Sequence, residues 1–256
     1  MNKQKVVIMT SGGLDSYVAY YYAKKMGYEP VPVWVDLGQP YAKKEEASID
    51  SFEFANEVKK IHIDLLRPEF NNVPDINHWI IPGRNLLLAV IGASFGDRVW
   101  ICALDGEMHK FARERDKTPE FYHLSSGLLT YVFDILRPET VVETPFANMT
   151  KTEIVKWALE NGITPEQLLK TSSCYDGEAG KPCGKCGTCF KRWVALTNNG
   201  LSEEYEYPPY GEENLYAQDS IKKMKEAWDK KDFSHYSEKR IKETFSALEK
   251  AGIKIL

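Results

Sequence analysis

Apolar positions along the first 160 residues alternate between short continuous runs and longer runs with helical spacing. Short apolar runs are typical of buried strands, and helical spacing is typical of helices. We expect strands at residues 5–10, 28–36, 60–65, 98–104 and 141–146. We expect helices at residues 17–26, 43–59, 86–95, 124–133 and 151–161. This order predicts an α/β fold, Rossmann-like, with a doubly wound parallel sheet and right-handed crossovers.

A change in composition near residue 201 indicates a boundary. Residues 203–211 are rich in proline and tyrosine, which is typical of a connector. Two groups of apolar residues then recur at helical spacing: Ile221, Met224 and Trp228, and Ile241, Phe245 and Leu248. We expect a main domain at residues 1–200, and a connector with two C-terminal amphipathic helices at residues 201–256. For these two helices, we favour apolar faces that pack on the core of the protein itself over a binding site for a partner protein.

The first predicted strand runs directly into Ser11-Gly12-Gly13-Leu14-Asp15-Ser16. Two glycines between a strand and a helix let the backbone approach a phosphate, which the helix N-terminus then binds. The kinase-type P-loop is excluded, because no Lys-Ser/Thr pair follows a G-x-x-x-x-G run. The pattern instead resembles the pyrophosphate loop of enzymes that cleave ATP between the α- and β-phosphates to adenylate a substrate. The predicted ATP-binding residues are Thr10, Ser11, Gly12, Gly13, Leu14, Asp15 and Ser16.

Four of the five cysteines form a tight cluster: Cys174, Cys183, Cys186 and Cys189. Their C-x8-C-x2-C-x2-C spacing predicts a small metal-binding region, with Gly184 and Gly187 allowing the tight turns. Four thiolates suit a closed, structural Zn²⁺ site, and an iron–sulfur cluster is the alternative that this spacing favours less. Cysteine usage of this kind points to a reducing compartment, so we expect a cytoplasmic protein. Cys102 lies in a predicted strand, where we expect it to be inert.

The composition limits which kinds of binding partner we expect. The net charge of −4 gives no support to nucleic acid as a partner. No apolar stretch reaches the roughly 18 residues of a membrane span, so we expect no membrane contact.

The pyrophosphate loop and this cysteine spacing occur together in the 7-cyano-7-deazaguanine synthase family, which the chain resembles over residues 5 to about 196. Four further motifs match: Gly38-Gln39, Pro82-Gly83-Arg84-Asn85, Glu143-Thr144-Pro145-Phe146 and Thr150-Lys151. A fifth match begins at the first clustered cysteine, Cys174-Tyr175-Asp176-Gly177. The resemblance implies an adenine nucleotide alpha hydrolase-like fold and a homodimer.

The resemblance also implies a reaction. The carboxylate of 7-carboxy-7-deazaguanine attacks the α-phosphate of ATP, ammonia displaces AMP, and a second ATP drives dehydration of the amide to the nitrile. Mg²⁺ accompanies ATP, with Asp15 as a candidate contact, and Arg84 and Lys151 are candidates for stabilising charge at the α-phosphate. The candidate substrate-binding residues are Gly38, Gln39, Arg84, Asn85, Asp105, Asp116 and Glu120.

Two segments depart from the family pattern. Residues 105–121 lose a Tyr-Pro pair, place Lys117 where a cysteine is expected and are several residues longer. The second departure is the tail beyond about Leu201. An alternative function is therefore that of a divergent antiphage-defence relative, which would join the adenylated deazaguanine to a protein amine. Less favoured alternatives are a tRNA-modifying enzyme with the same loop and a non-catalytic zinc module.

Overall fold

The computed structural model describes residues 3–39, 41–63, 83–108, 115–174 and 181–254. Two compact units divide the chain: residues 1–103 with 113–145, and residues 104–112 with 146–256. Each unit is described by itself below. The predicted functional division into residues 1–200 and 201–256 stays a prediction.

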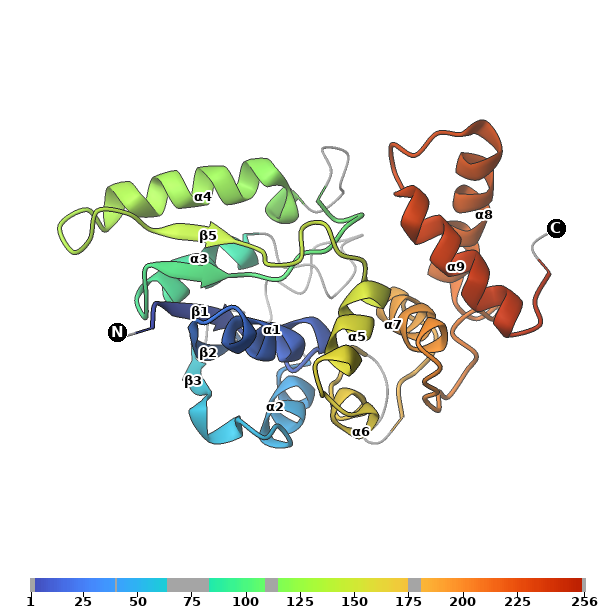
Figure 1. Cartoon of the computed structure of the whole chain (residues 1–256), viewed down its shortest axis with the longest axis horizontal. Helices are drawn as coiled ribbons and strands as arrows, with labels where there is room; N and C mark the ends of the chain where they lie inside the picture. The colour runs from blue at the N-terminus through green and yellow to red at the C-terminus, as the bar shows by residue number, and fades with distance from the viewer. Residues whose placement is uncertain (1–2, 40, 64–82, 109–114, 175–180, 255–256) are drawn as a thin grey trace. The chain divides into compact units, whose positions relative to one another are not determined.

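The first unit is built on a parallel five-stranded sheet, which confirms the α/β prediction. Its strands are β1 (Lys5–Met9), β2 (Glu29–Asp36), β3 (Lys59–His62), β4 (Arg98–Trp100) and β5 (Val141–Glu143). They lie in the order β3-β2-β1-β4-β5 (Figure 1). In the centre, Val7 of β1 pairs with Val31 of β2 on one side and Val99 of β4 on the other. The strand order reverses at β1, so the loop after β1 leaves the sheet at the switch point where open α/β sheets bind ligands.

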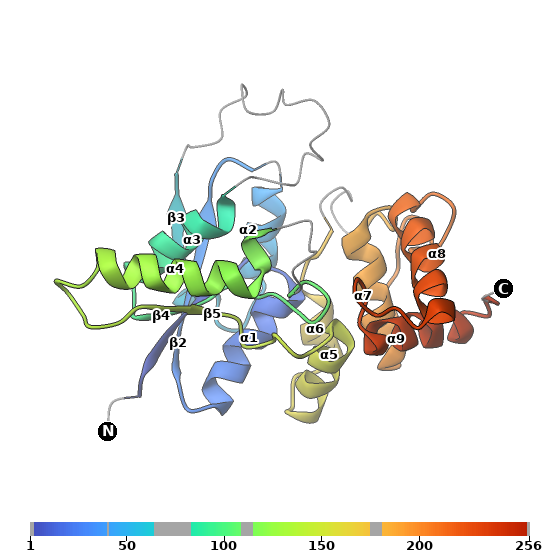
Figure 2. The ribbon, with the colours of Figure 1, turned by 90° about the horizontal axis from the view of Figure 1, so that it is seen from above.

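Helices cover both faces of this sheet (Figures 1 and 2). They are α1 (Leu14–Lys25), α2 (Ala42–Asp50), α3 (Arg84–Ala93) and α4 (Pro119–Val132), with short 3₁₀ turns at Ala55–Glu57 and Arg115–Lys117. Right-handed crossovers put α1 and α2 on one face and α3 and α4 on the other. Helix α3 lies close against the sheet, since a Cβ added at Gly92 would come within 2.6 Å of Val99 and 3.0 Å of Met9.

Several predicted boundaries differ from the structure. The predicted 43–59 helix is wrong beyond Asp50, where the chain turns so that Phe52 and Phe54 pack on α1. There the Phe54 and Tyr20 rings stack with 3.7 Å between centroids. Helix α4 begins five residues earlier than predicted, because Thr118 caps it and Pro119 occupies its first turn. Tertiary aromatic packing and an overlooked cap explain these two differences.

The second unit contains the remaining helices of the described residues. They are α5 (Lys151–Glu160), α6 (Pro165–Leu169), α7 (Gly187–Asn198), α8 (Leu215–Lys230) and α9 (Glu238–Lys250). The last two are the predicted C-terminal helices, and Met224, Ile241 and Leu248 are buried as their spacing predicts. Helix α7 packs against both α5 and α9, while α6 and α7 were not predicted. Across the described residues, every helix is too short or too polar to cross a membrane.

Candidate active site and metal centre

The loop after β1 has the geometry of an anion site. The Thr10 N–H donates to the Val33 carbonyl at 2.7 Å, which extends the pairing with β2 to the start of the loop. Ser16 Oγ closes the loop, since it accepts from the Ser11 N–H at 3.2 Å and donates to the Gly13 carbonyl at 3.1 Å. Gly13 is the N-cap of α1, and within the described part of the chain this helix end has no side-chain cap hydrogen bond. The N–H groups of the first turn lack intrahelical acceptors, so this end of α1 is suited to bind a phosphate.

Gly12 is required by the packing of α2 against the loop. Its φ of +70° is in the left-handed region, and an added Cβ would lie 2.7 Å from the Glu45 carbonyl oxygen. Ser48 Oγ also donates to the Gly12 carbonyl at 2.8 Å. Helix α2 therefore holds the shape of the loop by direct contact. The sequence motif indicates the glycine but not the helix that makes it necessary.

Asp15 lies half-buried in the first turn of α1. A carboxylate is a hard oxygen ligand of the kind that Mg²⁺ prefers. Its role as a metal contact stays a prediction.

Arg84 occupies the first position of α3 and is held by two side chains of the α2 region. Its Nη1 donates to the Tyr41 hydroxyl at 2.6 Å, and its Nη2 lies 3.8 Å from Glu45 Oε1. Glu45 is buried, and burial raises the pKa of its carboxyl while the Arg84 charge acts in the opposite direction. Glu45 also accepts from Trp34 Nε1 at 3.0 Å. The guanidinium is thus fixed in direction while its side chain stays 22% exposed.

Gln39, a predicted substrate ligand, is buried and uses its amide within the protein. Its Oε1 accepts from the Leu37 N–H at 2.7 Å, and its Nε2 donates to Glu45 Oε2 at 3.1 Å. It therefore supports the carboxylate that faces Arg84. Its neighbour Gly38 is exposed, with a φ of +83°. Substrate contact by these two residues stays a prediction.

The predicted residues Asn85 and Asp116 are brought together in the first unit. Asn85 Nδ2 donates to the Asp116 carbonyl at 2.9 Å, which ties the start of α3 to the turn before α4. Glu120, in the first turn of α4, is exposed. The part of segment 105–121 at residues 109–114 lies outside the described residues.

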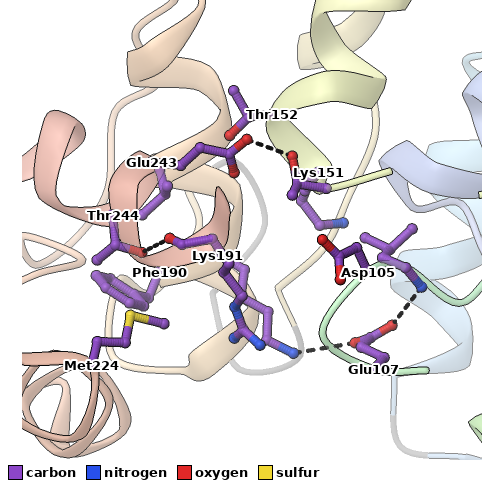
Figure 3. A pocket seen from close by; sticks show the side chains of 13 residues that line it. Asp105, Glu107, Lys151, Thr152, Phe190, Lys191, Met224, Glu243 and Thr244 are labelled. Atoms are coloured by element: carbon purple, nitrogen blue, oxygen red, sulfur yellow. Dashed lines mark hydrogen bonds and ion pairs between the residues drawn. The ribbon is translucent and has the colours of Figure 1, made fainter. Parts of the chain in front are cut away.

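Asp105 and Lys151 lie in the second unit, where both line a pocket (Figure 3). Their side chains extend toward one another in this view. Lys151 begins α5, directly after the capping residue Thr150. Across the pocket, Lys191 Nζ of α7 forms an ion pair with Glu107 Oε1 at 3.2 Å. The predicted site residues therefore fall into two sets, one in each unit.

The four clustered cysteines converge as predicted. Their Sγ atoms all lie within 4.8 Å of one another. Cys186 is the N-cap of α7, and Cys189 lies in its first turn. Backbone N–H groups approach two of the sulfurs, from Cys183 to Cys174 Sγ at 3.2 Å and from Lys185 to Cys183 Sγ at 3.3 Å.

The chemistry of this donor set fits a thiophilic metal. Burial, together with the nearby Cys186, raises the pKa of the Cys183 thiol to about 12. Hydrogen bonds to Cys174 and Cys186, and then burial, also raise the pKa of Cys189. Deprotonated thiols packed this closely require a compensating cation, and a closed set of four suits Zn²⁺ or iron. We therefore assign the cluster as a candidate structural metal centre.

Residues 205–214 cover the turn between the cysteines, which the sequence did not indicate. Gly184 has a φ of +75°, and an added Cβ would lie 1.8 Å from the Tyr207 carbonyl oxygen. The buried Asn214 donates from Nδ2 to the carbonyls of Gly184 at 2.7 Å and Cys186 at 3.1 Å. Its Oδ1 also accepts from the Ala217 N–H at 2.9 Å and so caps α8. The predicted connector is therefore a structural part of the metal centre.

The chain is similar in sequence to known proteins. A family model described as "Queuosine biosynthesis protein QueC" matches residues 5–200, which include the loop, Arg84, Lys151 and all four cysteines. A 7-cyano-7-deazaguanine synthase of Thermoplasma acidophilum is 27% identical, over 88% of this chain and 100% of its own length. One from Persephonella marina is 30% identical, over 78% of this chain and 95% of its own.

Some relatives are longer than this chain. A 7-cyano-7-deazaguanine synthase of Sulfolobus acidocaldarius is 27% identical over 80% of this chain, which spans only 48% of that protein's length. The family match itself covers more than three quarters of the chain and contains both the loop and the cysteine cluster. The chain therefore belongs to the QueC family of queuosine biosynthesis proteins.

Proposed function

We propose that the protein is an ATP-dependent carbon–nitrogen ligase that converts 7-carboxy-7-deazaguanine and ammonia into 7-cyano-7-deazaguanine. The observation that carries this proposal is the uncapped start of α1 behind the Ser11–Ser16 loop, at the switch point of the sheet. We assign this loop to the leaving pyrophosphate, because it resembles the pyrophosphate loop of adenylating enzymes and lacks the Lys-Ser/Thr pair of a P-loop. The family membership and the names of the relatives support the choice of substrate.

In the proposed first step, a carboxylate oxygen of the substrate attacks the α-phosphorus of ATP. The bond from that phosphorus to the bridging oxygen breaks, and pyrophosphate leaves with its charge held by the backbone donors of the loop. Mg²⁺ at Asp15 would neutralise further charge on the phosphates. Arg84 and Lys151 are the proposed cations at the α-phosphate, where negative charge accumulates in the transition state.

In the later steps, ammonia attacks the carbonyl carbon of the acyl adenylate and AMP leaves, which gives the amide. The amide oxygen then attacks the α-phosphorus of a second ATP, with release of pyrophosphate. Loss of AMP and a proton from this intermediate forms the nitrile. The cysteine centre, with Zn²⁺ as the proposed metal, takes no part in these steps because all four ligand positions are protein thiolates.

Incubation of the purified protein with ATP, 7-carboxy-7-deazaguanine and ammonium tests the proposal. We expect AMP and pyrophosphate only when the deazaguanine acid is present, and the nitrile as product in mass spectrometry. Release of AMP without nitrile or amide would overturn ammonia as the nucleophile. It would favour the second candidate, transfer of the adenylated acid to a protein amine.

We also propose that the protein is a homodimer through α4. This helix and the turn after it carry a stripe of exposed apolar side chains, among them Leu124, Leu128, Tyr131 and Ile135, which are 68%, 50%, 79% and 88% exposed. A second copy offers the same stripe, so the two can pair about a twofold axis. Full burial of each such side chain contributes about 1.5–3 kcal/mol.

Replacing Leu128 with glutamate is expected to convert the dimer to a monomer, because a charge at the centre of an apolar interface loses its hydration. Light scattering after size exclusion would measure the mass. Leu215→Glu is the matched control, since Leu215 is 78% exposed but belongs to α8 of the second unit and not to this stripe. A wild-type mass of a single chain at micromolar concentration would contradict the proposal.

A further inference from the structure

The pocket that contains Lys151 and Asp105 has walls from two parts of the chain. One part comprises residues 104–107, the start of α5 and α7. The other comprises Met224 of α8 with Arg240, Glu243 and Thr244 of α9 (Figure 3). These four residues lie beyond residue 200, where the family match ends. Residues 5–200 alone therefore supply only part of the lining of this pocket.

Helix α9 contacts both residues that cap α5. Thr150 and Glu153 form a capping box: the Glu153 N–H donates to Thr150 Oγ1 at 3.1 Å and the Thr150 N–H donates to Glu153 Oε2 at 2.9 Å. From α9, Glu243 Oε1 accepts from Thr150 Oγ1 at 2.6 Å. Lys239 Nζ forms an ion pair with Glu153 Oε1 at 2.9 Å. Two residues of α9 thus hold the capping box of α5, one at Thr150 and the other at Glu153.

Glu243 is itself firmly placed. It is half-buried, and its backbone carbonyl accepts from Asn198 Nδ2 of α7 at 2.8 Å. Burial raises the pKa of its carboxyl, and hydrogen bonds from Thr150 and Thr152 act in the opposite direction. Its position at the N-terminus of α5 is favourable for an acidic side chain.

We propose that Glu243 is a positioning residue for Lys151, and that α9 is consequently a working part of the active site. Lys151 directly follows Thr150, so the hydrogen bond to Glu243 fixes the backbone from which the lysine side chain extends. A cation acts on developing charge only when it is held in place before the reaction. The catalytic part of this inference rests on the proposed role of Lys151.

Pyrophosphate release from ATP and the deazaguanine acid would be measured in Glu243→Ala, Lys151→Ala and the double variant. We expect Glu243→Ala to lower kcat by about 10²-fold, as a displacement of the lysine by about 1 Å can do. The KM for ATP should change by less than about twofold, since the interaction acts in the transition state. The double variant should be no slower than Lys151→Ala, because both changes remove the same contribution. Additive losses would overturn the proposal.

Two further variants separate positioning from general destabilisation. Glu249→Ala, an exposed glutamate on the same helix, should keep the wild-type kcat. Glu243→Gln, which keeps the shape and one acceptor, should recover part of the loss. A Glu243→Gln variant as slow as Glu243→Ala with an equal drop in Tm would contradict a positioning role.

Hydrogen exchange gives a readout that does not depend on catalysis. Amides of residues 150–155 should exchange faster in Glu243→Ala and not in Glu249→Ala. If Lys151→Ala releases pyrophosphate at the wild-type rate, the proposed function of Lys151 fails. The structural part is then decided by exchange alone, and unchanged protection at residues 150–155 would overturn it.

Discussion

Replacing Cys189 with serine is expected to abolish metal binding and to unfold much of the second unit at moderate temperature. Cys189 is completely buried in the first turn of α7, with its sulfur among the other three thiols. Binding of a structural metal contributes about 10–16 kcal/mol to folding in small zinc domains, and that contribution requires all four ligands. We expect the Tm to fall by at least about 10 °C. Elemental analysis and calorimetry would measure the two effects.

The matched control for this variant is Cys102→Ser. Cys102 is a half-buried cysteine that lies outside the cluster. This variant should keep one metal ion per chain and nearly the wild-type Tm. One zinc ion per chain in elemental analysis of a colourless wild-type protein would identify zinc, whereas visible absorption would identify an iron–sulfur cluster. Full metal content in Cys189→Ser would refute the four-thiolate site.

Replacing Gly12 with alanine is expected to lower ATP-dependent activity by about 10²-fold. The backbone at Gly12 has a φ of +70°, which costs a non-glycine residue about 1–2 kcal/mol. In addition, the new Cβ would lie 2.7 Å from the Glu45 carbonyl, so the loop or α2 has to move. A shift of about 1 Å in a phosphate-binding loop can reduce the rate by about 10²-fold. Pyrophosphate release and calorimetric titration with ATP would measure the loss.

Gly27→Ala separates the two causes. Gly27 has a φ of +88°, but an added Cβ there would have no neighbour within 4 Å. This variant should show only the backbone cost and should bind ATP as the wild type does. Equal losses of ATP affinity in the two variants would contradict the role of α2 in shaping the loop.

Local patterns in the sequence predicted the sheet and the two motifs of the site. The central strand β1, its loop and the start of α1 follow from one apolar run and two glycines. The four cysteines follow from spacing alone. Helix α7 was missed because its N-cap is Cys186, a residue that gives no capping signal and serves the metal centre instead.

The contacts that hold Arg84 and Thr150 in place could not be predicted from local patterns. Arg84 and its partner Tyr41 are 43 positions apart, and Thr150 and Glu243 are 93 positions apart. Such pairs depend on how distant helices pack, and neither apolar periodicity nor motif spacing records that packing. For Glu45 the sequence offered one weak signal of burial. This charged residue lies four positions before the buried Ile49, and residues at that spacing share one face of a helix.

The contact between Gly184 and Tyr207 has a consequence for how such a chain could arise. With the Tyr207 carbonyl where it lies, any side chain at residue 184 would overlap it. Docking of the tail in this position therefore requires glycine at residue 184. Once the tail had docked, that glycine could no longer be exchanged. The tail and the metal-binding turn would from then on be inherited as a single unit.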